Sequence, residues 1–264
     1  MRRGHRLRLD IAYNGREFHG WQIQPEARTV QGELRDYLTR LLGRPVTPVG
    51  AGRTDAGVNA RGQTAHLTVA TDDEVERIMR ALPRMMPDDI DIRAVRRVSH
   101  DFNARFSATS RSYSYNILLV RDIFRPLSWH VFRPLDRAVL DAGAGAFCGA
   151  HDFTSFCKAS SLKANTNICE VSHCAFEWRD DSAIFRVHAN RFLHHMVRNM
   201  LGTLIEIGVG ERDNDIPDIL AARSRSAAGK MAPAAGLFLE EVTYPEELMD
   251  PEFNATAPGE GDEP

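Results

Sequence analysis

The segment RLRLDIAY, residues 6–13, contains the first sign of the fold. Leu7, Leu9 and Ile11 alternate with charged residues, a pattern typical of a strand with one buried face. A helix with Thr29 as its N-cap is expected next, because apolar residues then recur at helical spacing. The later elements of this half are expected as strand, strand, helix and strand, over residues 46–49, 64–69, 73–82 and 90–98. The order β-α-β-β-α-β is that of a ferredoxin-like unit.

The second half of the chain repeats this order. Its expected segments are a strand, a helix, two strands, two helices and a final strand, over residues 111–120, 136–147, 168–178, 183–189, 192–208, 216–223 and 237–244. We therefore predict an α+β fold of two ferredoxin-like (RRM-like) halves, joined into one extended, mainly antiparallel sheet with helices on one side and a central active-site cleft. The predicted domains are residues 1–104 and 105–244. Residues 245–264 are rich in proline, glycine and acidic residues and are expected to form a disordered tail.

Composition places the chain among globular proteins. Of its 264 residues, 43% are hydrophobic and 26% charged, enough apolar side chains for a sizeable core. No apolar run approaches the roughly 18 residues of a membrane span, and no apolar segment follows the basic N-terminus as it would in a secretory signal. We therefore expect a cytoplasmic protein without a membrane partner. The four cysteines fit no common zinc spacing and are expected to be buried free thiols: Cys148, Cys157, Cys169 and Cys174.

Charge is unevenly distributed along the chain. The net charge is −3, yet residues 245–264 contain seven acidic residues and no basic one. The first 70 residues contain 11 arginines against six acidic residues. A basic region followed by an acidic tail favours a polyanionic partner such as a nucleic acid.

The most unusual stretch is the glycine-rich loop GAGRTDAGVNA, residues 50–60. Its three glycines allow positive φ angles and a close approach of the backbone to a ligand. Asp55, two residues after Arg53, could act there as a nucleophile or a base. No Gly-Lys-Ser/Thr follows, so the loop is not a phosphate loop of the common type. On the residues alone, a hairpin in which Asp55 caps a turn is the favoured explanation of the stretch.

The segment GRTDAGV, residues 52–58, resembles the signature loop of the tRNA pseudouridine synthase A family. Further segments resemble that family in the same order along the chain: YNG at 13–15, GWQIQ at 20–24, TVQ at 29–31, FNARFSAT at 102–109, DFTSF at 152–156 and FLHHMVRN at 192–199. The resemblance covers residues 7–244. It departs from the family pattern at Asn14, where Asp is usual, and at Asn59, where His is usual.

The resemblance implies an isomerase that acts on uridines 38, 39 and 40 in the anticodon stem-loop of tRNA. The enzyme breaks the N1–C1′ bond, turns the uracil and rejoins it through C5. Asp55 matches the essential carboxylate, which attacks either C1′ or C6; the sequence leaves both routes open. The family uses no cofactor and no metal, and it forms homodimers that share the tRNA.

Three other residues receive roles from the resemblance. Arg198, on the helix expected over 192–208, is expected to pair with Asp55 and favour its ionised form. Tyr113 is expected to stack on the target base and to accept a proton, although alone it reads as a cross-strand packing residue. Arg53 is expected to hold the target nucleotide out of the helix.

Backbone contacts to the RNA are expected from basic residues spread over the chain: Arg2, Arg3, Arg6, Arg8, Arg16, Arg28, Arg61 and Lys163. Two other functions stay open on the residues alone. A non-catalytic RNA-binding protein or RNA chaperone would need the basic residues and aromatics but not Asp55. A glycosidase would need two carboxylates beside the bond, and the loop supplies one.

Overall fold

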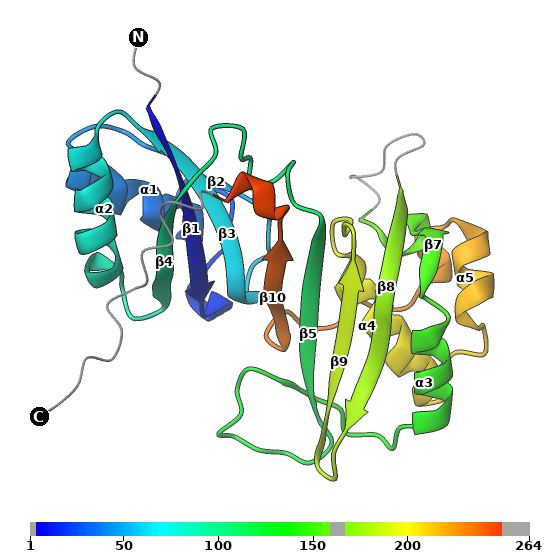
Figure 1. The fold of residues 1–264 in the computed structure, drawn as a ribbon. Helices are drawn as coiled ribbons and strands as arrows, with labels where there is room; N and C mark the ends of the chain where they lie inside the picture. Colours follow the sequence, from blue (N-terminus) through cyan, green and yellow to red (C-terminus); the bar gives the residue numbers. More distant parts are fainter. Residues whose placement is uncertain (1–3, 159–166, 250–264) are drawn as a thin grey trace, which may run out of the picture. The chain divides into compact units, whose positions relative to one another are not determined.

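The structure, a computed structural model, describes residues 4–158 and 167–249 (Figure 1). The predicted contact residues Arg2, Arg3 and Lys163 lie outside these residues, as does the part of the expected tail from residue 250 on. The described chain forms two compact units. Unit 1 comprises residues 4–56, 60–108 and 242–249, and unit 2 comprises residues 57–59 and 109–241.

Unit 1 has the predicted strand and helix order. Strand β1 (His5–Tyr13) pairs antiparallel with β3 (Asn59–Val69) on one side and with β4 (Ile90–Val98) on the other. A short strand, β2 (Val49–Gly50), pairs antiparallel with β3. Leu7, Leu9 and Ile11 are fully buried, which confirms the alternation predicted for β1.

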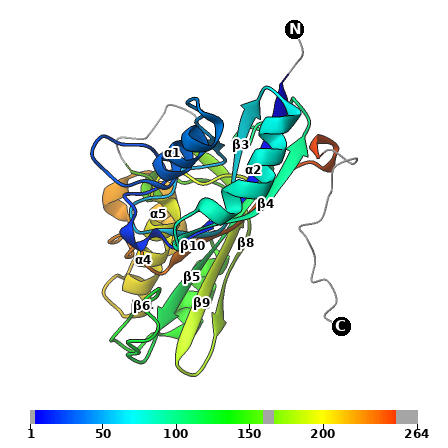
Figure 2. The same ribbon diagram turned by 90° about the vertical axis from the view of Figure 1, so that its left-hand side faces the viewer.

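Two helices cover the apolar residues of unit 1. Helix α1 (Val30–Leu42) begins as predicted, because the Thr29 side chain accepts a hydrogen bond from the Gly32 amide, and it ends at Gly43, whose φ is +70°. Helix α2 (Asp72–Met85) packs against α1 (Figure 2). The strand predicted at 46–49 is wrong, since only Val49 and Gly50 pair. Prolines 45 and 48 lack the amide hydrogens that a strand there would need.

Unit 2 contains a larger, mainly antiparallel sheet. Strand β5 (Ser110–Leu118) lies between β10 (Leu237–Thr243) and β9 (Ser182–Ala189), and β8 (Ile168–Trp178) follows β9. Strand β7 (Gly149–Asp152), which the sequence did not predict, pairs with β8 at the edge, and β6 (Trp129–His130) pairs parallel with β5. The predicted α+β class and mainly antiparallel pairing are confirmed.

The helices of unit 2 are α3 (Arg137–Gly145), α4 (Met196–Gly208) and α5 (Ile216–Ala222). Figure 2 shows α4 and α5 on one side of β5, β9 and β8. The prediction that α4 starts at Phe192 is wrong, because His195 has a φ of +67° and the helix begins after it. Within residues 4–158 and 167–249, no helix is long and apolar enough to span a bilayer.

The first residues of the expected tail belong to unit 1. Glu246–Leu248 form a 3-10 helix, and the Ser99 amide donates a hydrogen bond to the Leu248 carbonyl over 3.0 Å. Met249 forms a bridge with Val98 at the end of β4. The chain therefore returns to unit 1 after β10.

Candidate functional site

Residues 51–56 form a loop after β2 that carries Asp55. Thr54 in this loop is buried, with 7% of its surface exposed, whereas Arg53 is exposed and Asp55 is half-buried. The buried Thr54 side chain thus anchors the loop in the interior of unit 1. Its two charged neighbours, Arg53 and Asp55, are more accessible.

Two buried side chains hold the loop by hydrogen bonds. The Tyr13 hydroxyl lies 2.7 Å from Thr54 Oγ1. Gln63 Nε2, from β3, donates to the Gly52 carbonyl over 3.1 Å and reaches the Tyr13 hydroxyl at 3.5 Å. Burial raises the pKa of Tyr13 to about 12, so the phenol keeps its proton at neutral pH. The loop therefore rests on a neutral hydrogen-bonded network.

The segment Gly20-Trp21 supports the other side of the loop. The Trp21 amide donates to the Thr54 carbonyl over 3.1 Å, and the Trp21 side chain is 2% exposed. A Cβ on Gly20, whose φ is +90°, would lie 2.6 Å from the Thr54 carbonyl oxygen. Only glycine allows this backbone to lie so close to the residue preceding Asp55.

The three loop glycines differ in what they do. Gly57 has a positive φ of +77°, as expected. A Cβ on Gly50 would lie 2.5 Å from the Trp21 ring, so Gly50 permits a close packing contact. Gly52 has neither property: its φ is not positive, and nothing lies within 4 Å of the position of a Cβ. Of the three loop glycines, only Gly57 takes a positive φ, and the close approach of the loop to a ligand stays a prediction.

Arg198 lies in the first half of α4, where residues 228–233 run against the helix. Its Nε donates to the Ala232 carbonyl over 2.9 Å, and the Ala232 amide donates back to the Arg198 carbonyl over 3.0 Å. A Cβ on Gly202 would lie only 1.8 Å from the Lys230 carbonyl oxygen. The glycine thus makes room for this segment, as its position inside a helix had indicated. Arg198 is half-buried, so it is not a freely solvated surface arginine.

Two neighbours of Arg198 on α4, Asn199 and Gly202, do not face solvent. Asn199 is 1% exposed and donates to the Phe156 carbonyl over 2.7 Å. Gly202 is also buried. This part of the helix is therefore enclosed by protein rather than presented as a polar surface.

Tyr113 and Tyr115 lie on β5 and have different surroundings. Tyr113 is half-buried and packs edge-on against Phe192, with ring centroids 5.0 Å apart. Tyr115 is fully buried, and its hydroxyl donates to the Pro233 carbonyl over 2.7 Å. Burial raises the pKa of Tyr115, and the positive charge of Arg198 acts in the opposite direction. Tyr115 thus supports the core, as predicted, and shares the 228–233 segment with Arg198.

A family model described as tRNA pseudouridine synthase matches residues 144–245. The tRNA pseudouridine synthase A of Moorella thermoacetica is 45% identical over 244 residues, which cover 90% of this chain and 99% of the relative. Those of Azorhizobium caulinodans and Halalkalibacterium halodurans are 41% and 42% identical, covering 93% and 88% of this chain and 96% and 90% of the relatives. The chain belongs to the tRNA pseudouridine synthase A family. Pseudouridine synthases are isomerases, so the predicted family and enzyme class are confirmed.

Membership of the tRNA pseudouridine synthase A family does not test the individual site residues. The structure places Arg53 and Asp55 on one loop of unit 1, and Tyr113 and Arg198 in unit 2. The pairing of Asp55 with Arg198 stays a prediction.

Three of the basic residues predicted to contact RNA form ion pairs with carboxylates: Arg8, Arg16 and Arg28. Arg28 donates to Asp89 over 2.6 Å and to Glu33 over 2.8 Å, and its guanidinium lies 4.2 Å from the Phe18 ring centroid. Arg8 donates to Asp10 over 2.6 Å. Asp89 is 61 positions away from Arg28, so only folding brings this pair together, whereas Asp10 lies two residues from Arg8 on β1. Arg16 and Arg61 are exposed and Arg6 is half-buried.

The two departures from the family pattern have separate structural roles. Asn59 is fully buried, and its Nδ2 donates to the Ala235 carbonyl over 2.8 Å, so it joins two segments of unit 2. Asn14 is exposed and accepts a hydrogen bond from the Arg16 amide over 3.2 Å. Asn59 therefore acts inside the fold, whereas Asn14 lies at its surface.

The cysteines are free thiols, and the prediction of burial holds for three of them. Cys157, Cys169 and Cys174 are buried, and burial raises the pKa of Cys169 to about 11. Cys148 is exposed, contrary to the prediction, because it lies in the turn between α3 and β7.

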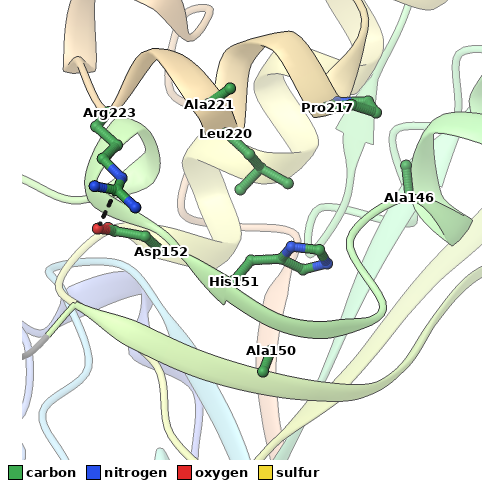
Figure 3. A pocket seen from close by; sticks show the side chains of 8 residues that line it. All are labelled: Ala146, Ala150, His151, Asp152, Pro217, Leu220, Ala221 and Arg223. Atoms are coloured by element: carbon green, nitrogen blue, oxygen red, sulfur yellow. Dashed lines mark ion pairs between the residues drawn. The ribbon is translucent and has the colours of Figure 1, made fainter.

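A pocket of about 560 Å³ lies in unit 2 between β7 and α5 (Figure 3). Arg223 and Asp152 form an ion pair of 3.3 Å at its edge, and the His151 ring faces the apolar side chains of the helix. The sequence did not predict this pocket, although DFTSF at 152–156 was one of the family-like segments. Its lining residues are Ala146, Ala150, His151, Asp152, Pro217, Leu220, Ala221 and Arg223.

Proposed function

We propose that this protein isomerises uridine to pseudouridine at positions 38, 39 and 40 of the tRNA anticodon stem-loop, with Asp55 as the nucleophile. Family membership supports the reaction and the tRNA substrate. The observation that carries the role of Asp55 is its place on a loop fixed through Thr54 by Tyr13 and Trp21. A reacting carboxylate must be held in place before its substrate binds, and the hydrogen bonds to Thr54 hold the loop of residues 51–56 in this way.

The reaction is balanced within the nucleotide. The N1–C1′ bond breaks, the uracil turns, and a C5–C1′ bond forms. C5 loses its proton and N1 gains one, so no redox partner or group donor is consumed. Asp55 attacks C1′ or C6, and the carboxylate is released when the new glycosidic bond is complete. No cofactor or metal is needed for this sequence of steps.

Three further side chains have proposed roles in the same reaction. Tyr113 stacks on the detached base and accepts the proton that leaves C5. Arg198 supplies a positive charge to the Asp55 carboxylate, and its bond to Ala232 limits its side-chain freedom. Arg53, exposed on the loop next to Thr54, takes the place of the extruded nucleotide or grips its phosphate.

The tRNA is bound mainly through its phosphates and shape. The excess of arginine in the first 70 residues supports this mode. We propose a homodimer as the active form, as the family resemblance implies.

The test is pseudouridine mapping on unmodified tRNA with wild-type protein and the Asp55→Asn variant. We expect the variant to lose at least about a thousandfold in rate, because the nucleophile is gone. Its affinity for tRNA should be unchanged or higher, because no cation is removed from the RNA surface. Asp91→Asn, at an exposed acid of the same unit, is the control and should react at the wild-type rate.

Residual turnover of Asp55→Asn within tenfold of wild type would remove Asp55 from the central role. A wild-type protein that binds tRNA but forms no pseudouridine would favour the non-catalytic RNA-binding function.

A further inference from the structure

The turn formed by residues 102–107 in unit 1 is unusually well fixed for an exposed segment. Asn103 Oδ1 accepts hydrogen bonds from the amides of Arg105 and Phe106, over 3.0 and 3.1 Å. The Asn103 amide donates to Ser107 Oγ over 3.0 Å, and the Ser107 amide donates to the Asn103 carbonyl over 2.9 Å. Four hydrogen bonds therefore close a turn of five residues.

The same turn is anchored to the unit beneath it. The Ala104 amide donates to His66 Nδ1 over 3.0 Å, and the Tyr244 hydroxyl donates to the Ala104 carbonyl over 2.7 Å. Phe102 is 1% exposed, with its ring 4.8 Å from that of Tyr244. The inward residues thus leave the turn little freedom to move as a whole.

The two outward side chains of the turn are an aromatic residue and a cation. Phe106 is 79% exposed, although a phenyl ring gains free energy by leaving water. The guanidinium carbon of Arg105 lies 5.3 Å from the centroid of the Phe106 ring. An exposed aromatic face beside an arginine is the combination that stacks on unpaired bases and binds the adjoining phosphate.

The anchor of the turn lies near the loop that carries Asp55. His66 is the register partner of Val49 in β2, and the Ala51 amide donates to the Thr64 carbonyl over 2.7 Å. His66 and Thr64 are two residues apart on β3, roughly 7 Å along the strand. The turn and the Asp55 loop are therefore held by adjacent positions of one strand.

Other exposed phenylalanines in the described residues lack this setting. Phe124 is 87% exposed and is followed by Arg125, which forms ion pairs with Asp122 and Asp181. Phe132 is 82% exposed and packs against His130, with ring centroids 4.1 Å apart. Phe124 serves as the control, because it is at least as exposed as Phe106 but lies outside the turn of residues 102–107.

We propose that Phe106 is a stacking platform for an unpaired base of the tRNA substrate, and that Arg105 contacts the phosphate of the same nucleotide. This inference rests on the proposed function, since it assumes that the ligand is tRNA. Stacking requires a flat apolar face, so tryptophan can replace Phe106 and alanine cannot. The platform positions the RNA and takes no part in bond making.

The test measures the dissociation constant for unmodified tRNA and the single-turnover rate of pseudouridine formation for wild type, Phe106→Ala, Phe106→Trp, Arg105→Ala and Phe124→Ala. We expect Phe106→Ala to bind tRNA about tenfold more weakly, the loss of one base–aromatic stack. Phe106→Trp and Phe124→Ala should bind within twofold of wild type. The salt dependence of binding should be unchanged in Phe106→Ala and weaker in Arg105→Ala, which loses a phosphate contact.

Three outcomes would overturn the platform. Phe106→Ala could bind tRNA as wild type does, Phe106→Trp could bind as weakly as Phe106→Ala, or Phe124→Ala could show the same loss. Each is meaningful only if wild-type protein forms pseudouridine. A wild-type protein without that activity would contradict the proposed function instead, so the two failures are distinguishable.

Discussion

The loop that carries Asp55 and the helix that carries Arg198 are both held rigidly, but by different means. The loop is held by groups from elsewhere in unit 1, the Tyr13 hydroxyl, the Gln63 amide group and the Trp21 backbone. The first half of α4 is held by residues 228–233, which lie against the helix with no room for a Cβ on Gly202. The loop would therefore lose support with the Tyr13 hydroxyl or the Gln63 amide group and would be strained by a Cβ on Gly20, whereas the helix is sensitive above all to an added Cβ on Gly202.

The largest effect should come from adding one carbon to the helix. Gly202→Ala should lower the free energy of unfolding by at least about 3 kcal/mol, because its Cβ would overlap the Lys230 carbonyl, a backbone atom that cannot turn aside. Urea unfolding measures this. Gly145→Ala in α3, where nothing lies within 4 Å, is the control and should be neutral or stabilising by up to about 1 kcal/mol. Equal stabilities for the two variants would show that residues 228–233 are loosely held.

Removing the charge from the same helix should affect the reaction more than the fold. Arg198→Ala should lower the single-turnover rate about a hundredfold, because the carboxylate of Asp55 would lose its proposed partner. The tRNA affinity should stay within threefold of wild type. A variant with normal turnover and weaker tRNA binding would place Arg198 among the phosphate contacts and end the proposed pairing.

His66, which holds the turn of residues 102–107 in unit 1, makes the stability of the fold dependent on pH. His66 is 5% exposed, and burial together with the charge of Arg6 lowers its pKa from 6.5 to about 4. The folded protein thus disfavours protonation of His66. The contribution of His66 to the free energy of unfolding is therefore fully present above pH 6.5 and is lost as the pH drops toward 4. Between pH 7.5 and pH 5 we expect His66 to account for about 2 kcal/mol of lost stability.

The measurement for His66 is urea unfolding of wild type and His66→Gln at both pH values. Glutamine can still accept a hydrogen bond from the Ala104 amide but does not titrate. The free energy of unfolding of His66→Gln should therefore fall less between pH 7.5 and pH 5 than that of wild type. The same loss in both proteins would mean that His66 is protonated in the fold.

The smallest expected effect is the loss of a single oxygen beneath the Asp55 loop. Tyr13→Phe should cost about 1 kcal/mol of unfolding free energy, because Thr54 Oγ1 loses its buried partner. The rate of pseudouridine formation should fall only a few-fold, since Trp21 and Gln63 still hold the loop. If the rate fell as far as in Asp55→Asn, the hydroxyl would have a part in the chemistry.

Local patterns predicted the regular elements of the fold well. The alternation at residues 7–11 and the Thr29 cap depend on near neighbours in the sequence, and both predictions were confirmed. The start of α4 was misplaced because the left-handed backbone of His195 has no signature in its side chain. Strand β7 was missed because four residues are too few for a hydrophobic pattern.

The residues of the candidate site were proposed from the sequence and their roles stay predictions, but the hydrogen bonds that hold the Asp55 loop could not be predicted. Asp55, Arg53, Tyr113 and Arg198 followed from the family resemblance. The bonds from Tyr13 and Gln63 join residues that are about 40 and 10 positions away from the loop, and only folding brings them together. Only folding likewise brings Arg28 to Asp89, and this ion pair could not be predicted from the sequence.

The return of the chain to unit 1 after β10 has a consequence for synthesis in the cell. Tyr244 and Leu248 complete unit 1 through bonds to Ala104 and Ser99, yet they follow the whole of unit 2 in the sequence. These contacts therefore form only after residues 109–241 have been synthesised. The first unit to emerge is therefore the last to close, and a chain that terminates early at residue 240 would leave it open.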